Sequence, residues 1–462
     1  MIHPCTRRRI LPGGASLSIA MLASPNSLAA TRTLARTRIK RLVSSCGIEA
    51  WSVQDSTVPL IAMEFAFTGG ATQDPSQKPG VSHMVAGLLK EGSGDLDFKT
   101  FHKRLERRAI ELRFRSTHDH FHGSLRTLKD NADEAFDLLR MALTSPRFDA
   151  ADVERIRATV LARLRHDSTD PSSVAHRKFL EVAFSDHPYA RPAGGSLESV
   201  PKIEVADLKA YGRRVIAKDT LKIAVVGDVD PGVLCKLLDK TFGSLPTEAE
   251  ATPVPEVVPA KPPRRVFIPL DVPQTVVTFG GPAVRRSEPD FMAAYVVNHI
   301  LGGAGLTSRL FREVREKRGL AYSVRENLVW LDHSAIFLGN SATCADRADE
   351  TVEEIEKQVR HISEEGPTQQ ELDDGKSYLK GSQVLALNTS SKLARTLLRH
   401  QLDKLAIDYF EKHNAMVDLV TLEDAKRAAQ RLWGEGLLTI IVGRSPRDAA
   451  QPTPCHREPH PR

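Results

Sequence analysis

Two segments of this 462-residue chain follow the same pattern, and this repetition limits the possible folds more than any other feature. Residues 203–231 (IEVADLKAYGRRVIAKDTLKIAVVGDVDP) and 419–446 (LVTLEDAKRAAQRLWGEGLLTIIVGRSP) each predict a helix followed by an apolar strand that ends in Val-Gly. Gly227 corresponds to Gly443, a separation of about 216 residues. A repeat this long indicates duplication of a whole domain rather than a solenoid.

Within each half, the strands are expected in neighbouring groups, with helices in separate stretches. The strand segments are rich in Val, Ile, Phe and Thr, and the helical segments carry apolar stripes at a 3.6-residue period. This arrangement predicts an α+β fold of two homologous α/β sandwich halves, each an antiparallel-rich sheet covered by helices on one face. The expected strands lie in 47–55, 58–70, 110–128, 275–283, 321–342 and 437–444, and the clearest helices in 131–146, 150–167 and 347–367.

A Pro- and Glu-rich segment separates the two halves and marks the domain boundary. We assign 47–245 to the N-terminal domain, 246–265 to an extended linker and 266–447 to the C-terminal domain. Residues 448–462 are expected to form a disordered tail.

Charge and composition exclude several classes of function. The formal net charge is +6, but much of the excess lies near the N-terminus, and no long basic run contains interleaved aromatic residues. Nucleic-acid binding is therefore not supported. The sequence contains no run of 18 apolar residues, so we expect no membrane span. None of the five cysteines forms a CxxC pair, which leaves both a zinc knuckle and a redox motif unsupported.

The N-terminus is typical of an export signal. Residues 6–11 (TRRRIL) resemble a twin-arginine pattern, a weakly apolar stretch follows, and SLAA at 27–30 offers small residues for cleavage. We therefore expect a signal peptide over 1–30, an N-terminal extension over 31–46 and a periplasmic or otherwise exported protein. The alternative is a basic tail or a misassigned start on a cytoplasmic protein.

Residues 299–324 (HILGGAGLTSRLFREVREKRGLAYSV) carry the most specific motif in the chain. The segment resembles part of the C-terminal half of pitrilysin/insulinase-type zinc peptidases, which include the mitochondrial processing peptidases. The resemblance runs from about residue 47 to 447, and it implies a clamshell of two facing halves. It also implies that Arg315, Tyr322 and the glycines Gly302 and Gly303 bind peptide substrate.

The zinc-binding half of that family's site is degenerate in this chain. The family motif HxxEH places two histidine ligands and a general-base Glu on one helix, and a Glu on a later helix is the third ligand. His83 matches the first His, whereas Ala86 stands for the general base and Gly87 for the second His. Arg163, or its neighbour Ala162, stands for the third ligand. Since one His cannot hold catalytic zinc, we expect no metal to be bound by this chain.

Three further histidines offer another possible metal site. His118, His120 and His122 alternate along a predicted strand, so their side chains would share one face. The simpler interpretation is a polar, solvent-facing or cavity-facing side of that strand. Similarly, His83 alone is interpreted as an ordinary helical histidine.

The Arg–Tyr spacing predicts a defined local structure. Gly319 is a good helix terminator, so we expect Arg315 near the end of a helix and Tyr322 in the strand that follows. The alternative to substrate binding is a surface ion pair of Arg315 with Glu313 or Glu316, and an ordinary strand position for Tyr322.

The resemblance therefore implies a non-catalytic subunit, or pseudo-peptidase. Some bacterial members of the family are heterodimers in which one subunit carries HxxEH and the other the Arg–Tyr pair. We expect this chain to bind a peptide or unfolded polypeptide and to complete the active site of a homologous, HxxEH-bearing partner that holds the zinc. The alternatives are a zinc-free peptide-binding or scaffolding protein, and a self-sufficient metallopeptidase that uses His83 with the strand of His118, His120 and His122.

Overall fold

The computed structural model describes residues 39–303, 305–385 and 387–444. The predicted signal peptide over 1–30, residues 31–38 of the predicted extension and the predicted tail over 448–462 lie outside these residues. Among the helices described, none is long and apolar enough to cross a membrane.

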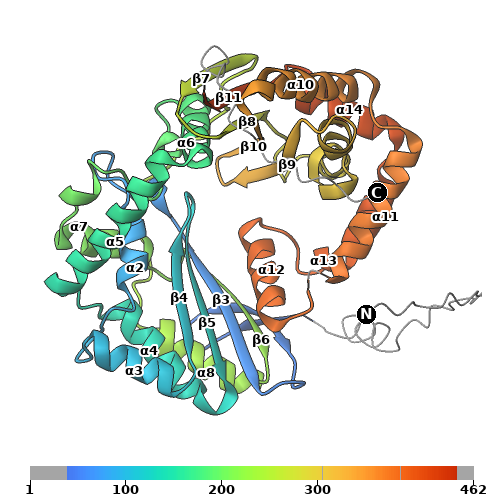
Figure 1. The fold of residues 1–462 in the computed structure, drawn as a ribbon. Coiled ribbons are helices and arrows are strands. Elements are labelled where there is room, and N and C mark those ends of the chain that lie inside the picture. Colours follow the sequence, from blue (N-terminus) through green and yellow to red (C-terminus); the bar gives the residue numbers. More distant parts are fainter. Residues whose placement is uncertain (1–38, 304, 386, 445–462) are drawn as a thin grey trace, which may run out of the picture. The chain divides into compact units, whose positions relative to one another are not determined.

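The N-terminal half is built on a six-stranded sheet with the strand order β1-β2-β6-β3-β5-β4. Its main core lies between this sheet and helices α2, α3, α4, α7 and α8 (Figure 1). The strands are β1 (Lys40–Val43), β2 (Glu49–Gln54), β3 (Leu60–Thr68), β4 (Glu111–Ser116), β5 (His120–Leu128) and β6 (Leu221–Gly227). The helices are α2 (Val81–Leu88), α3 (Phe98–Arg107), α4 (Ala132–Thr144), α5 (Ala150–Thr169), α6 (Pro171–Phe184), α7 (Val205–Val215) and α8 (Pro231–Phe242).

The C-terminal half contains a five-stranded sheet with the order β7-β11-β8-β10-β9. Its core lies between the sheet and helices α9, α10 and α14 (Figure 1). The strands are β7 (Arg264–Pro269), β8 (Gln274–Pro282), β9 (Ala321–Leu331), β10 (Ser334–Cys344) and β11 (Leu438–Gly443). The helices are α9 (Phe291–Asn298), α10 (Ala348–Glu365), α11 (Gln369–Leu385), α12 (Ser390–Leu402), α13 (Tyr409–Leu419) and α14 (Leu422–Trp433).

The strand order confirms the duplication predicted from the sequence. The order β2-β6-β3-β5-β4 of the first sheet matches β7-β11-β8-β10-β9 of the second, and in both the first pair is parallel while the others are antiparallel. The repeated helices α7 and α14 both begin with a capping box, formed by Glu204 with Asp207 and by Thr421 with Asp424. The predicted α+β fold of two α/β sandwich halves is confirmed.

Each half contributes one helix to the other half's sheet, which the sequence did not predict. Helix α6 packs on β8 and β11, where Phe179 and Phe184 join a buried apolar cluster. Helix α12 packs on β3 and β6, where Leu397 and Leu398 do the same. Helices therefore lie on both faces of the central strands, and the sequence halves 47–245 and 266–447 are not separate packing units.

A buried hydrogen-bond network adds a second contact between the halves. The Tyr189 hydroxyl donates to Asp119 over 2.6 Å, and the backbone N–H of Asp332 donates to the other Asp119 oxygen over 3.0 Å. The backbone N–H of His333 donates to the Tyr189 hydroxyl over 3.1 Å. Because Asp332 and His333 form the turn between β9 and β10, this network fixes that hairpin to the N-terminal half.

One repeated packing motif places a glycine beneath a phenylalanine on the neighbouring strand. Gly123 on β5 pairs with Phe65 on β3, and Gly339 on β10 pairs with Phe279 on β8. A Cβ at Gly123 would lie 2.0 Å from the Phe65 ring, and one at Gly339 would lie 2.2 Å from the Phe279 ring. Both rings are fully buried, so neither has room to move.

We therefore predict that Gly123→Ala and Gly339→Ala each lower the free energy of unfolding by about 1–3 kcal/mol, because an added methyl overpacks the core. Denaturant unfolding followed by circular dichroism measures this. Gly212→Ala, in helix α7 with no atom within 4 Å of the new Cβ, is the control and should be neutral or stabilising. Equal stability of all three variants would contradict the packing argument.

Candidate functional site

Arg315 and Tyr322 lie on either side of a tight helix end. The predicted helix is present as the π-helical segment η7 (Phe311–Glu316). Gly319 has a φ of +57°, and the N–H groups of Gly319 and Leu320 donate to the carbonyls of Arg315 and Val314 over 3.0 and 2.9 Å. Strand β9 then begins at Ala321, so the predicted order of helix, glycine and strand is confirmed.

The guanidinium of Arg315 is exposed and stacks over the Phe311 ring, 4.7 Å from its centroid. It makes no ion pair with any described residue. Glu313, which we considered as its surface partner, instead binds Lys317 at 2.8 Å and Arg318 at 3.1 Å. Burial opposes the ionisation of Glu313, but hydrogen bonds from these cations outweigh it and lower its pKa to about 2. The alternative of a surface ion pair between Arg315 and Glu313 or Glu316 is therefore wrong. The N–H donors of the Arg315 guanidinium remain available to a ligand.

Tyr322 lies on β9, the outermost strand of the C-terminal sheet. Its side chain is 47% exposed, and its hydroxyl lies 3.9 Å from the Cys344 sulfur. Within the described chain, β9 pairs only with β10, so its other side presents unpaired backbone N–H and C=O groups. An extended peptide that adds to this edge would run along the strand that carries Tyr322.

The two predicted glycines have different environments. Gly302, in the π-helical segment η5 (His299–Gly303), is buried against β9, and a Cβ there would lie 2.6 Å from the backbone nitrogen of Glu326. Gly303 is exposed, and a Cβ there would meet nothing closer than 3.4 Å. Gly302 thus lets the segment approach the strand that carries Tyr322, whereas Gly303 is accessible to a ligand.

Glu326 is a buried acid that sequence analysis missed. It occupies an inward position of β9 between Val324 and Leu328, and Asn298 donates to it over 2.8 Å. Burial raises the pKa of Glu326 to about 8, while the Asn298 hydrogen bond partly favours the ionised form. The signal was visible as a charged residue at an apolar position of an alternating strand.

We predict that Glu326 makes the protein less stable as the pH rises. A carboxyl group with a folded pKa of about 8, above its usual 4.5, holds its proton more tightly in the folded chain. The free energy of unfolding should therefore decrease between about pH 4.5 and pH 8. Glu326→Gln should flatten this dependence and stabilise the protein at pH 8, measured by denaturant unfolding across this range. The exposed Glu353→Gln variant is the control, and an unchanged slope in Glu326→Gln would refute the assignment.

The positions that correspond to the zinc site do not fit a metal. His83 lies on α2, where burial and, to a lesser extent, the positive charge of Arg163 lower its pKa. Ala86 is buried and Gly87 has no side chain, and a Cβ added at Gly87 would lie 3.0 Å from Ile156, so neither position offers a ligand atom. The Arg163 side chain is 74% exposed and lies 3.5 Å from Asp167. The guanidinium of Arg163, whose charge already affects the His83 ring, would also repel a zinc ion bound to a ring nitrogen of His83.

The three strand histidines do not form one row. Strand β5 begins at His120, and His118 lies in the bend before it, with its ring packed edge-on against Tyr189 at 5.7 Å. The prediction that all three share a strand face is therefore wrong for His118. The rings of His120 and His122 are 5.7 Å apart, and His120 lies 3.3 Å from the Asp332 carboxylate. No group of three or more His, Cys, Asp or Glu side chains suited to a metal occurs among the described residues.

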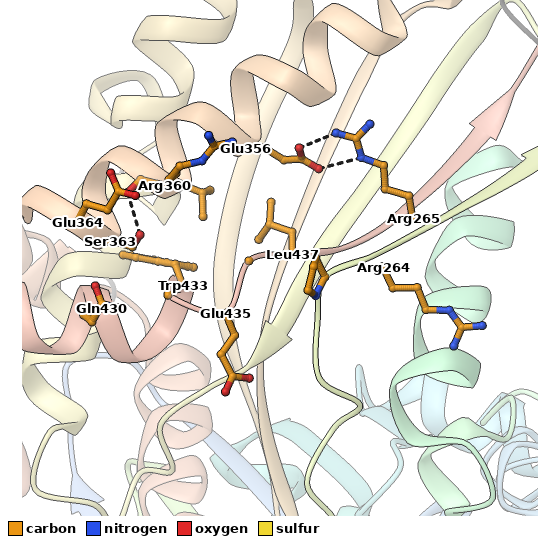
Figure 2. A pocket seen from close by; sticks show the side chains of 14 residues that line it. Arg264, Arg265, Glu356, Arg360, Ser363, Glu364, Gln430, Trp433, Glu435 and Leu437 are labelled. Atoms are coloured by element: carbon orange, nitrogen blue, oxygen red, sulfur yellow. Dashed lines mark hydrogen bonds and ion pairs between the residues drawn. The ribbon is translucent and has the colours of Figure 1, made fainter.

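A separate cavity of about 570 Å³ lies in the C-terminal half between α10, α14 and β7. Figure 2 shows the bidentate ion pair of Arg265 and Glu356 at one side and Trp433 at the other. None of the predicted site residues lines this cavity. Its wall mixes arginine and glutamate side chains, so it presents neither a uniform charge nor an apolar surface.

Comparison with known proteins gives this geometry its context. Residues 51–196 match the description "Insulinase (Peptidase family M16)", and residues 202–379 match "Peptidase M16 inactive domain". The non-peptidase homolog YmxG of Helicobacter pylori is 30% identical over 79% of this chain and 89% of its own length. An uncharacterised zinc protease of Mycobacterium tuberculosis is 28% identical over 81% of this chain and 86% of its own.

Solved structures show the same fold. A peptidase M16 inactive domain from Pseudomonas fluorescens superimposes with a TM-score of 0.82 at 26% identity, over 88% of this chain and 98% of that one. A protease from Helicobacter pylori gives a TM-score of 0.80 at 20% identity, over 88% and 99%. The two halves and their degenerate zinc positions thus define a protein of the zinc-peptidase type with an altered metal site. The chain belongs to the insulinase family, peptidase family M16.

The relatives are named both as a non-peptidase and as zinc proteases, so the residues of this chain must decide its metal chemistry. We predict that the protein binds zinc only after Ala86→Glu, Gly87→His and Arg163→Glu are combined, which would give roughly one zinc per chain because three protein ligands are then available. Metal analysis after dialysis measures this.

Adding His83→Ala to the triple variant is the control and should abolish the binding. Stoichiometric zinc in the unaltered chain would overturn the assignment of a lost site and would direct attention to His120 and His122.

Proposed function

We propose that this protein is a non-catalytic, pseudo-peptidase subunit that binds peptide substrate and completes the active site of an HxxEH-bearing partner. One observation carries the proposal. Arg315 and Tyr322 are exposed beside an open strand edge, while Ala86, Gly87 and Arg163 occupy the positions of the metal chemistry. The chain thus retains the groups that hold a peptide but not those that activate water.

The geometry suggests how the retained groups would act. A peptide bound along β9 would be aligned by backbone hydrogen bonds, which hold an extended chain regardless of its side chains. The Tyr322 hydroxyl and the Arg315 guanidinium are donors suited to a carbonyl oxygen that gains negative charge. The partner's zinc would supply the activated water.

Stacking on Phe311 restricts the Arg315 side chain without neutralising it. A guanidinium held in this way loses less conformational freedom when it binds a carbonyl oxygen. A function in substrate positioning therefore suits this side chain better than a surface ion pair does.

The proposal predicts that cleavage requires both chains. The purified protein should show no peptidase activity alone on a quenched peptide library, but activity should appear when it is mixed with an HxxEH-bearing homologue. Arg315→Ala or Tyr322→Phe should reduce kcat/KM of the mixture by about 10²-fold or more, because a donor to the developing oxyanion is lost. Zinc should be found only in the partner.

Two exposed side chains of the same types provide matched controls. Arg264→Ala and Tyr378→Phe should leave the activity of the mixture unchanged. Activity of the isolated chain would instead favour a self-sufficient metallopeptidase. Peptide binding without cleavage in any mixture would favour a zinc-free binding or scaffolding protein.

The site of action is proposed from the N-terminal pattern. A twin-arginine type signal at 1–30 would place the protein and its partner in the periplasm, where exported peptides are the available substrates.

A further inference from the structure

One face of the N-terminal sheet carries an excess of positive charge. On the face opposite the main core, the register places Arg115 beside His122 and Arg113 beside Ser124. Arg126 follows on the same face of β5, and helix α12 adds Arg395 and Arg399 one turn apart. We call this set the basic face, and it consists of Arg113, Arg115, Arg126, Arg395, Arg399 and His122.

The exchanged helix α12 brings its arginines to this face. Its Leu397 and Leu398 are buried against the central strands, which leaves Arg395 and Arg399 exposed at the border of the uncovered strands. Arg395 lies 3.5 Å from Glu64 on β3. Burial lowers the pKa of Arg115. The negative charge of Glu64 raises it, and the positive charges of Arg395 and Arg399 lower it further. The Arg115 residue keeps an exposed surface although its neighbours partly desolvate the guanidinium, and it lies close enough to the guanidiniums of Arg395 and Arg399 to be affected by them.

Acidic groups on the same face do not balance these cations. Glu111 lies 3.7 Å from Arg113 and 3.4 Å from Arg126. Glu64 is buried and also accepts a hydrogen bond from Ser124 over 3.1 Å. Near Arg399, the carboxylate of Asp403 is paired with Arg286 at 3.0 Å. The carboxylate of Asp332 lies 3.3 Å from His120, which is on the same face of β5. Five arginines thus face Glu64 and Glu111, and neither Arg115 nor Arg399 forms an ion pair within the described chain.

Such an excess is unfavourable unless something compensates it. Like charges on neighbouring strands destabilise a sheet, and clustered cations raise the local concentration of anions. Guanidinium groups bind carboxylates in a bidentate manner, which makes carboxylate the best-matched ligand.

The strand that carries Arg113 and Arg115 is also an open edge. Among the described strands, β4 pairs only with β5, so its free side offers backbone groups to an extended chain. The basic face presents no exposed aromatic ring, and His122 is buried. Single-stranded nucleic acids bind through stacking on exposed rings, so a polypeptide suits this surface better.

We propose that the basic face binds acidic side chains of an extended polypeptide segment that lies along β4. This inference rests on the proposed function in one respect, because it names the class of peptide that the subunit would select. It assigns Arg115, Arg395 and Arg399 as contacts for substrate carboxylates, at positions separate from Arg315 and Tyr322.

The test measures binding to the isolated full chain and needs no partner or zinc. Fluorescent peptides of one length are compared, with Glu, Gln or Lys at alternate positions, all acetylated and amidated so that terminal charges are absent. The Glu peptide should bind about tenfold or more tightly than the Gln peptide, because each carboxylate gains charge-assisted hydrogen bonds. This preference should weaken when salt rises from roughly 50 to 200 mM.

Variants locate the site. Arg115→Gln combined with Arg395→Gln should remove the preference for Glu, whereas Arg264→Gln, an exposed arginine of the other half, should retain it. Because both altered side chains are exposed, thermal unfolding should show a folded protein. If the double variant does not fold, Arg399→Gln alone should still reduce the preference.

The other outcomes separate the possible ligands. Equal binding of the Glu and Gln peptides would overturn the proposal. If a Gln peptide with a free C-terminus binds as tightly as the Glu peptide, the basic face recognises a terminal carboxylate rather than acidic side chains, and the proposal is overturned. An oligonucleotide of matched charge that binds more tightly than the Glu peptide would also overturn it. If the peptides show no preference for Glu but cleavage by the mixture still depends on Arg315 and Tyr322, the basic-face proposal fails and the proposed function stands. If the preference for Glu is found but cleavage does not depend on Arg315 and Tyr322, only the proposed function is refuted.

Discussion

The exchange of helices between the two halves is the interaction on which the rest of the structure depends. Helix α6 buries Phe179 and Phe184 on the C-terminal sheet, and helix α12 buries Leu397 and Leu398 on the N-terminal sheet. Each half would otherwise leave one face of its central strands uncovered, and apolar strands such as β3 and β8 would contact water. The duplication therefore produced one interdependent unit from two repeats, with each repeat completing the other's core.

The same exchange decides which surfaces remain available. Helices α6 and α12 pack mainly on the central strands, and β4 and β9, the outermost strands at one end of each sheet, keep open edges in equivalent positions. Tyr322 lies on one of these edges and Arg115 on the other. The Arg–Tyr pair and the basic face thus lie at equivalent places in one repeated architecture, an edge strand beside polar side chains.

The histidines show why alternation along a strand is weak evidence for a metal site. His118 and His120 are committed to the contact between the halves, through Tyr189 and through Asp332. The buried Asp119 accepts one hydrogen bond from Tyr189 of its own half and one from the backbone N–H of Asp332 in the opposite half, which completes this contact. A polar cluster in the sequence therefore has a structural function that depends on residues more than 200 positions away.

Much of the fold followed from the sequence, because repeated apolar periodicity and glycine positions act locally. Two matching helix–strand units indicated the duplication, and Gly319 alone placed Arg315 before a helix end and Tyr322 after it. The resemblance also predicts that Ala86, Gly87 and Arg163 stand where the family's zinc motif has its base and two of its ligands. By contrast, the partners of α6 and α12, the burial of Glu326 and the gathering of Arg115, Arg395 and Arg399 depend on contacts between distant segments. Periodicity along a chain shows which face of an element is apolar, but only tertiary structure decides what that face packs against and which exposed charges lie side by side.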